Sequence, residues 1–186
     1  MKKTLKILLF VVVVIIAVPL LIALFAKKDY SVEKEIIVNQ PSELVFDYIR
    51  FLKNQDNFSV WMDMDTNVRQ EFRGTDGTVG FVSAWESDDK NVGAGEQEII
   101  AIQEGERIDY ELRFIEPFSS TSQAYMTTES IAHDQTLVKW GFVGRMNFPM
   151  NLMLVVMNFE DMIGDDLQQG LNNLKEILEK KETSDY

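Results

Sequence analysis

The 186-residue chain contains no cysteine and only one histidine, His133. The absence of cysteine excludes disulfides, thiolate metal sites and cysteine nucleophiles. A single histidine excludes a histidine-rich metal site and leaves a Ser-His-Asp triad without support. His133 precedes Asp134 in a segment that we expect to form a solvated turn, a poor position for a general base. We therefore predict no catalytic residue, no metal site and no cofactor.

Positive charge is scarce beyond the first 28 residues. Residues 1–28 contain five of the 18 Lys and Arg residues, whereas all 30 acidic residues lie from Asp29 onward. The remaining 13 basic residues leave residues 29–186 with a formal charge of −17. Such a domain is repelled by phosphates, so we expect no nucleic-acid partner.

Residues 7–26 form an apolar run of 20 residues that is interrupted only by Pro19 and flanked by lysines. As a helix this run covers about 30 Å, the thickness of a bilayer's hydrocarbon core. It predicts an uncleaved single-pass anchor, within residues 1–28, that contacts the membrane through residues 7–26. A cleaved signal peptide is the competing interpretation, but the run is long for one and no small-x-small pair is well placed before Lys27.

The lysines that flank the run favour one orientation. Lys2, Lys3 and Lys6, together with the amino terminus, slightly outnumber Lys27 and Lys28. By the positive-inside rule the amino terminus then lies in the cytoplasm. This orientation places the acidic domain on the non-cytoplasmic side.

Residues 30–145 predict mostly short strands. A first strand over 30–39 precedes a helix that begins near Ser42 and a loop or second short helix over 54–65. Residues 107–114 alternate strictly between apolar and charged, which is typical of a strand with one buried face. The other predicted strands cover residues 66–72, 79–86, 96–102, 119–131 and 137–145.

The last long segment, residues 149–181, predicts the helix around which the domain is built. Its apolar residues recur at spacings of three and four, as on a helix with one buried face. About 33 residues would extend about 50 Å, longer than a small domain is wide. We therefore predict a bend or weak point near Gly164 or Gly170, since glycine lowers helix stability. The domain is expected to end near residue 182, and residues 183–186 are expected to form a disordered tail.

Several short motifs, in this order of elements, carry a resemblance to a known superfamily. The motifs are Trp61 before Asp63 and Asp65, GAGE at 93–96, RIDYEL at 107–112 leading to EPF at 116–118, TLVKW at 136–140, IGD at 163–165 and GLNNLK at 170–175. Over residues 30–181 the chain resembles the START / polyketide cyclase-dehydrase-like superfamily, SRPBCC.

The resemblance implies an α+β helix-grip fold. In that fold a seven-stranded antiparallel sheet wraps around a long C-terminal helix, with a cavity between them. Members bind hydrophobic ligands such as lipids, sterols and polyketides, and some catalyse cyclisation or hydrolysis. The resemblance thus implies a pocket but no particular substrate.

Aromatic and methionine side chains are the candidates for the lining of such a cavity, because ligand pockets are mostly apolar. Methionine in particular offers a flexible, polarisable surface. The same residues could equally fill a core, since a core and a pocket share composition. The candidates are Trp61, Phe81, Trp85, Tyr110, Phe114, Met126, Trp140, Phe142, Met153 and Met157.

The leading hypothesis is a membrane-tethered binding or carrier domain for a small hydrophobic ligand, lipid-like or polyketide-like. Tethering would raise the concentration of the domain near a bilayer that stores such ligands. One alternative is a cyclase- or hydrolase-like enzyme that uses inward Asp, Glu or Tyr side chains in the same cavity. Another is a protein-interaction domain with a filled core and an acidic surface.

Overall fold

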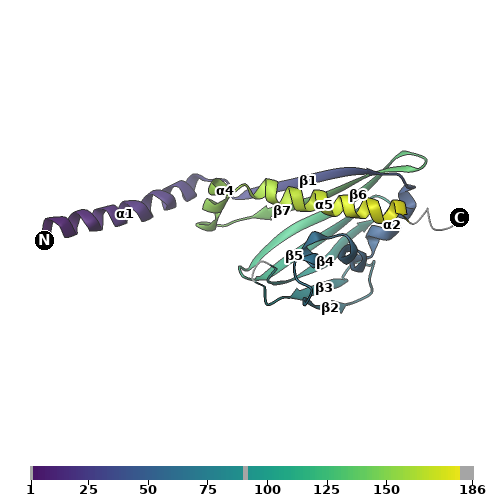
Figure 1. Ribbon diagram of the computed structural model, residues 1–186, viewed down its shortest axis with the longest axis horizontal. Coiled ribbons are helices and arrows are strands. Elements are labelled where there is room, and N and C mark those ends of the chain that lie inside the picture. Colours follow the sequence, from purple (N-terminus) through teal and green to yellow (C-terminus); the bar gives the residue numbers. More distant parts are fainter. Residues whose placement is uncertain (1, 90–91, 181–186) are drawn as a thin grey trace.

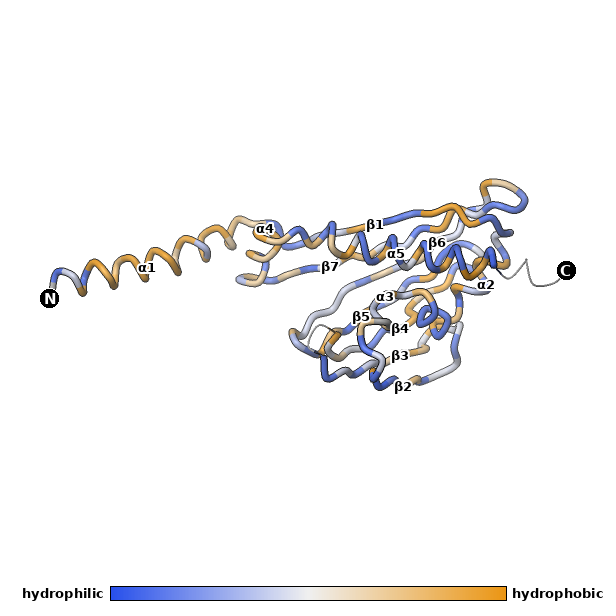
Figure 2. Tube along the Cα trace, viewed as in Figure 1, coloured by the Kyte–Doolittle hydropathy of each residue, from blue (hydrophilic) through white to orange (hydrophobic). Residues whose placement is uncertain are grey.

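The computed structural model describes residues 2–89 and 92–180. A long helix, α1 (Lys2–Phe25), projects from one end of a separate sheet-and-helix domain (Figure 1). Its Lys3–Phe25 stretch is long and apolar enough to cross a membrane, a test that a signal sequence also passes. Figure 2 shows hydrophobic colouring along nearly all of α1, whereas the C-terminal helix α5 (Phe159–Lys180) alternates between the two colours.

The domain contains one antiparallel sheet of seven strands in the order β1-β7-β6-β5-β4-β3-β2. This confirms the predicted strand count and fold class. The strands are β1 (Asp29–Val38), β2 (Arg69–Arg73), β3 (Val82–Glu86), β4 (Ala94–Gln103), β5 (Arg107–Glu116), β6 (Ser120–Ala132) and β7 (Gln135–Arg145). The predicted tail, residues 183–186, lies outside the described residues.

Helices cover the inner face of the sheet. The connection from β1 to β2 forms α2 (Ser42–Arg50), the 3₁₀ helix η1 (Leu52–Asn57) and the short α3 (Val60–Asp63). Helix α2 packs against β6 and β7, while α5 packs mainly against β1 and also contacts α3. The long helix therefore runs along one side of the curved sheet (Figure 1).

The predicted helix over 149–181 is interrupted, but not where we expected. It consists of η2 (Met150–Leu152), α4 (Met153–Val156) and α5, with extended backbone at Met157 between α4 and α5. The Asn158 carbonyl accepts the first hydrogen bond of α5, from the Met162 amide at 3.1 Å. Asparagine is favoured at this capping position, and Glu160 and Asp161 complement the positive end of the helix dipole.

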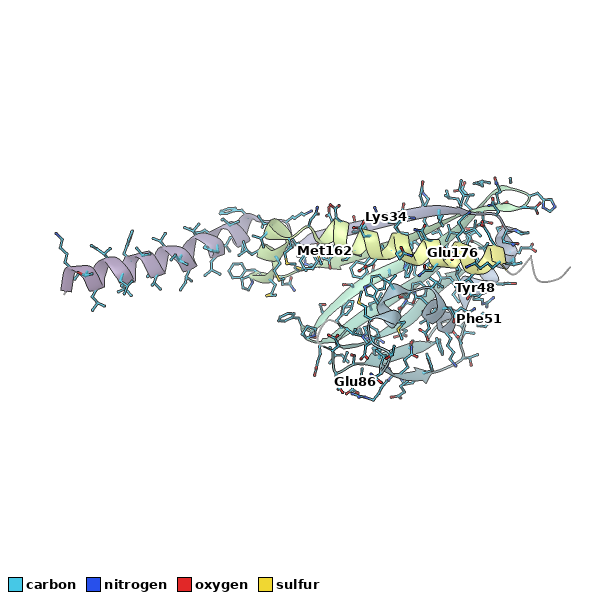
Figure 3. All side chains as sticks on the ribbon, viewed as in Figure 1. Lys34, Tyr48, Phe51, Glu86, Met162 and Glu176 are labelled. Carbon is cyan, nitrogen blue, oxygen red and sulfur yellow. The ribbon has the colours of Figure 1, made fainter. Side chains whose placement is uncertain are left out.

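Gly164 and Gly170 are interior residues of α5, and both lie against the sheet. A Cβ on Gly170 would lie 2.7 Å from Cζ3 of Trp140, and one on Gly164 would lie 2.7 Å from Cε of Lys34. Lys34 lies on β1 beside α5 (Figure 3). The prediction of a weak point at these glycines was wrong, because both positions lie where the helix approaches the sheet closely.

The two faces of the sheet differ sharply in chemistry. On the outer face, the Arg113 guanidinium contacts three carboxylates, those of Glu96, Glu98 and Glu111, at 2.5–2.7 Å. On the inner face, one row of paired residues crosses most of the sheet and is buried throughout. This core row consists of Phe81, Ile99, Tyr110, Ala124, Phe142 and Val32.

Candidate functional site

The inner face becomes more open toward the end of the sheet that lies nearest α1. Two further rows of residues follow the core row in that direction, and we call them the open rows. The first consists of Ser83, Gln97, Leu112 and Ser122, and the second of Trp85, Gly95, Phe114 and Ser120. Trp85 and Phe114 are half-buried, and Ser120 is exposed. Of the eight residues only Gly95 and Ser122 are buried, so the open rows are more accessible than the core row.

The open rows are apolar with a few uncharged polar groups. The Trp85 and Phe114 rings meet edge to face, with centroids 6.0 Å apart, and the Trp85 indole N–H donates to the Val92 carbonyl at 3.4 Å. Gly95 leaves room for the indole, because a Cβ there would lie 2.6 Å from Cζ2 of Trp85. Hydroxyl groups of Ser83 and Ser122 and the Gln97 amide supply hydrogen-bonding capacity without charge. This composition is typical of a site for a small apolar ligand.

The structure separates the ten predicted lining residues into four groups. Five lie in the buried core: Phe81, Tyr110, Met126, Trp140 and Phe142. Trp85 and Phe114 lie on the open rows, and Trp61 is half-buried with its ring edge-on to Trp140 at 5.9 Å. Met153 and Met157 belong to α4 and its C-cap, beside α1, and neither lies in the core cluster.

The sequence reasoning missed the polar members of the open rows. Ser83, Gln97 and Ser122 lie on three different strands, and only the strand register brings them together. Strand alternation places Ser83 on the same face as Phe81 and Trp85, and the same rule could have assigned Gln97 and Ser122 to the inner face, because residues two apart along a strand face the same side. These residues were left out because only aromatic and methionine side chains were considered as lining candidates.

The one histidine, His133, lies in the turn between β6 and β7 with an almost fully exposed side chain. Its Nδ1 lies 2.5 Å from a carboxylate oxygen of Asp134, and this contact raises the pKa of His133. The exposure of this side chain confirms the prediction of a solvated turn. The turn lies at the end of β7 that is far from α1.

Two carboxylates have environments that favour their protonated form. Desolvation raises the pKa of Asp166 on α5, although a hydrogen bond with Trp61 opposes the effect. Desolvation likewise raises the pKa of Asp56, which is hydrogen-bonded to Gln70. Each carboxylate has its own partner, and neither belongs to the open rows.

Replacing Asp166 by asparagine is expected to change how stability depends on pH. Because the folded state raises the pKa of Asp166, the folded chain binds more protons than the unfolded chain between the two pKa values. The contribution of Asp166 to stability therefore falls as pH rises through that window, which starts at about 3.9. Asparagine keeps an acceptor for Trp61 but carries no charge.

The test is chemical unfolding of both full-length chains in detergent from about pH 4 to about pH 7. The stability of Asp166→Asn relative to the parent should rise with pH and then level off. A difference that is flat or falls with pH would contradict the assignment.

Solved structures with the same architecture support the description of the fold. A structural-genomics protein from Nitrosospira multiformis is 20% identical, with a TM-score of 0.55, and the match covers 78% of this chain and 94% of that one. Norcoclaurine synthase from Thalictrum flavum, in complex with dopamine and hydroxybenzaldehyde, is 10% identical with a TM-score of 0.62, covering 86% and 91%. This chain has a helix-grip fold.

At these identities the similarity establishes the helix-grip fold alone. A protein from the dynemicin biosynthetic locus also matches, at 11% identity and a TM-score of 0.55, over 80% of this chain and 47% of that one. No family model matches the chain, and no curated protein matches it in sequence. Membership of SRPBCC agrees with these helix-grip neighbours and remains a prediction.

Proposed function

We propose that this chain is a membrane-tethered binding or carrier domain for a small hydrophobic ligand. The observation that carries the proposal is the pair of open rows. There, half-buried aromatic and apolar side chains lie among uncharged polar groups on the inner face of a helix-grip sheet. Buried apolar area supplies affinity, and a few hydrogen-bonding groups orient the ligand.

The ligand-bound neighbour is consistent with this proposal. Norcoclaurine synthase has the same fold and was solved with the small aromatic molecules dopamine and hydroxybenzaldehyde. In the present chain the eight residues of the open rows include no ionisable side chain, which favours binding over acid–base chemistry there.

The tether is the second part of the proposal. Helix α1 is apolar over a length that matches a bilayer, and almost none of this apolar stretch is buried in the protein. A helix that is hydrophobic all round needs an apolar environment. We propose that α1 spans the membrane and holds the binding domain beside a store of hydrophobic ligands, on the non-cytoplasmic side.

A matched pair of variants tests the ligand site. Phe114 and Ile115 are neighbours on β5 whose side chains lie on opposite faces of the sheet. The full-length chain is purified in mild detergent, its bound small molecules are counted by native mass spectrometry, and they are then identified after organic extraction. Phe114→Arg should lower the ligand occupancy about tenfold or more, because a charge in an apolar site lacks a partner.

Ile115→Arg should leave the occupancy of the ligand unchanged, since Ile115 is exposed on the outer face. An apolar molecule bound at near one-to-one and lost only in Phe114→Arg would support the proposal. An empty parent chain, or equal loss in both variants, would contradict it.

One observation favours an enzyme as the second candidate. Asp166 is a partly desolvated carboxylate with a raised pKa, and it lies next to the indole of Trp61. A carboxyl group whose pKa is raised by desolvation is a candidate general acid. Loss of turnover in Asp166→Asn with retained ligand binding would favour this cyclase- or hydrolase-like function.

A further inference from the structure

The segment between β7 and α5 is the most apolar stretch outside α1. Residues 146–158 contain no Asp, Glu, Lys or Arg, although 26% of the whole chain is charged. This segment includes η2 and α4, and we call it the collar because it lies against the last turn of α1. In Figure 1 it occupies the junction between α1 and the domain.

Asn151 joins the collar to α1. Its side-chain amide donates to the Ala23 carbonyl at 2.7 Å and to the Ala26 carbonyl at 3.2 Å. The last four carbonyls of a helix have no partner within the helix, and leaving one unpaired in an apolar environment costs several kcal/mol. Asn151 and Ala23 are both fully buried. The collar is thus held at the depth of the last turn of α1.

The surface of the collar exposes large apolar side chains beside α1. Val156 is 73% exposed and Phe25, at the end of α1, is 90% exposed. Phe148, Met150, Val155 and Met157 are also exposed. Met162 continues this surface onto the first turns of α5 (Figure 3). An apolar surface of this kind on a protein marks a site of interaction.

An open hollow lies where α1 and α4 meet. It is shallow and wide open, and it is lined by Leu21, Ile22, Phe25, Ala26 and Val155. All five side chains are apolar, so the hollow matches a hydrocarbon chain better than a polar molecule.

Charged residues begin immediately on the domain side of the collar. Lys27 pairs with Glu160 at 2.7 Å, and Arg145 pairs with Asp29 at 2.9 Å. These pairs are exposed, and they separate the apolar collar from the acidic domain. The sequence of apolar helix, apolar collar and charged pairs follows the polarity of a bilayer from hydrocarbon to headgroup to water.

We propose that the collar is embedded in the leaflet from which α1 emerges, at the boundary between acyl chains and headgroups, with a lipid acyl chain in the hollow. This inference rests on the membrane span of the proposed function. Interfacial elements bury their apolar face about 5–10 Å into that boundary, which is the depth of one to two turns of α1. Embedding the collar holds the domain close against the bilayer.

The absence of cysteine permits a direct test with single labels. Val156→Cys, Val13→Cys and Ile131→Cys each place one thiol on an exposed apolar residue: in the collar, in the middle of α1 and at the far end of β6. Each full-length variant carries an environment-sensitive nitrobenzoxadiazole label and is reconstituted into phosphatidylcholine vesicles. Quenching is measured with a nitroxide on the lipid acyl chain and, separately, with a water-soluble quencher.

The label at Val156 should be quenched by the acyl-chain nitroxide at least about twofold more than the label at Ile131, and less by the aqueous quencher. A label at Val156 that matches Ile131 in both measurements would overturn the proposal. So would a label that is shielded from both quenchers, because a second copy of the chain would then cover the collar.

The label at Val13 separates this inference from the proposed function. If Val13 is quenched from the lipid while Val156 is not, the collar proposal fails and the membrane span stands. If neither label is quenched from the lipid, the span fails and the collar proposal fails with it.

Discussion

Replacing Trp140 by alanine is expected to lower the free energy of unfolding by about 3–5 kcal/mol. Trp140 is buried on β7, and its ring lies edge-on to Phe58 at 5.5 Å and to Trp61 at 5.9 Å. It also lies directly under Gly170 of α5. Removing the indole therefore leaves a void where β7, α3 and α5 meet, and close-packed surroundings fill such a void only partly.

The measurement is urea unfolding of the full-length chain in detergent, followed by near-ultraviolet circular dichroism. Val143→Ala is the matched control, since Val143 lies on the same strand but is exposed on the outer face. The control should change stability by less than about 1 kcal/mol. Equal losses of stability in the two variants would show that Trp140 is not a centre of packing.

The second large effect concerns the two glycines of α5, which should respond differently to alanine. In Gly170→Ala the new methyl group meets the Trp140 ring at 2.7 Å and the Phe58 carbonyl at 3.3 Å. Phe58 and Trp61 hold that ring in place, so overpacking should cost about 1–3 kcal/mol, more than the gain of up to about 1 kcal/mol in helix propensity.

Gly164→Ala should be tolerated. Its nearest neighbour would be Cε of Lys34, the far end of a flexible side chain, with Val32 at 3.3 Å. The lysine can move aside, so the helix-propensity gain should offset most of the contact cost. Thermal unfolding of both variants decides the matter: Gly170→Ala should have the lower midpoint. A lower midpoint for Gly164→Ala would contradict the packing described here.

The patterns that determined the fold were local ones. Strict alternation in residues 107–114 predicted β5, and the polar GTDG at 74–77 predicted the break between β2 and β3. The apolar run at 7–26 predicted the helix α1 in the same way. These features follow from side-chain periodicity, because each element must match the polarity of its own surroundings.

The interruption of the C-terminal helix could not be predicted from periodicity. Apolar residues continue at helical spacing across this break, from Val155 and Val156 to Phe159, so the pattern indicated one helix. Instead, α4 is a separate short helix. The η2 turn just before it is held by a hydrogen bond from Asn151 to Ala23 in the last turn of α1, 128 residues away in the chain. Asn158, followed by Glu160 and Asp161, was the one local signal of a new helix start.

The sequence by itself thus determined the strands, the apolar N-terminal helix, the charge separation and the absence of cysteine chemistry. Only the tertiary structure decided which side chains share a surface. Ser83, Gln97, Leu112 and Ser122 form one row because four strands pair in one register. The collar faces α1 because β1 and β7 pair with Asp29 beside Arg145, which brings the two ends of the domain together. Pairing register and helix docking depend on contacts between distant residues, and no local pattern contains them.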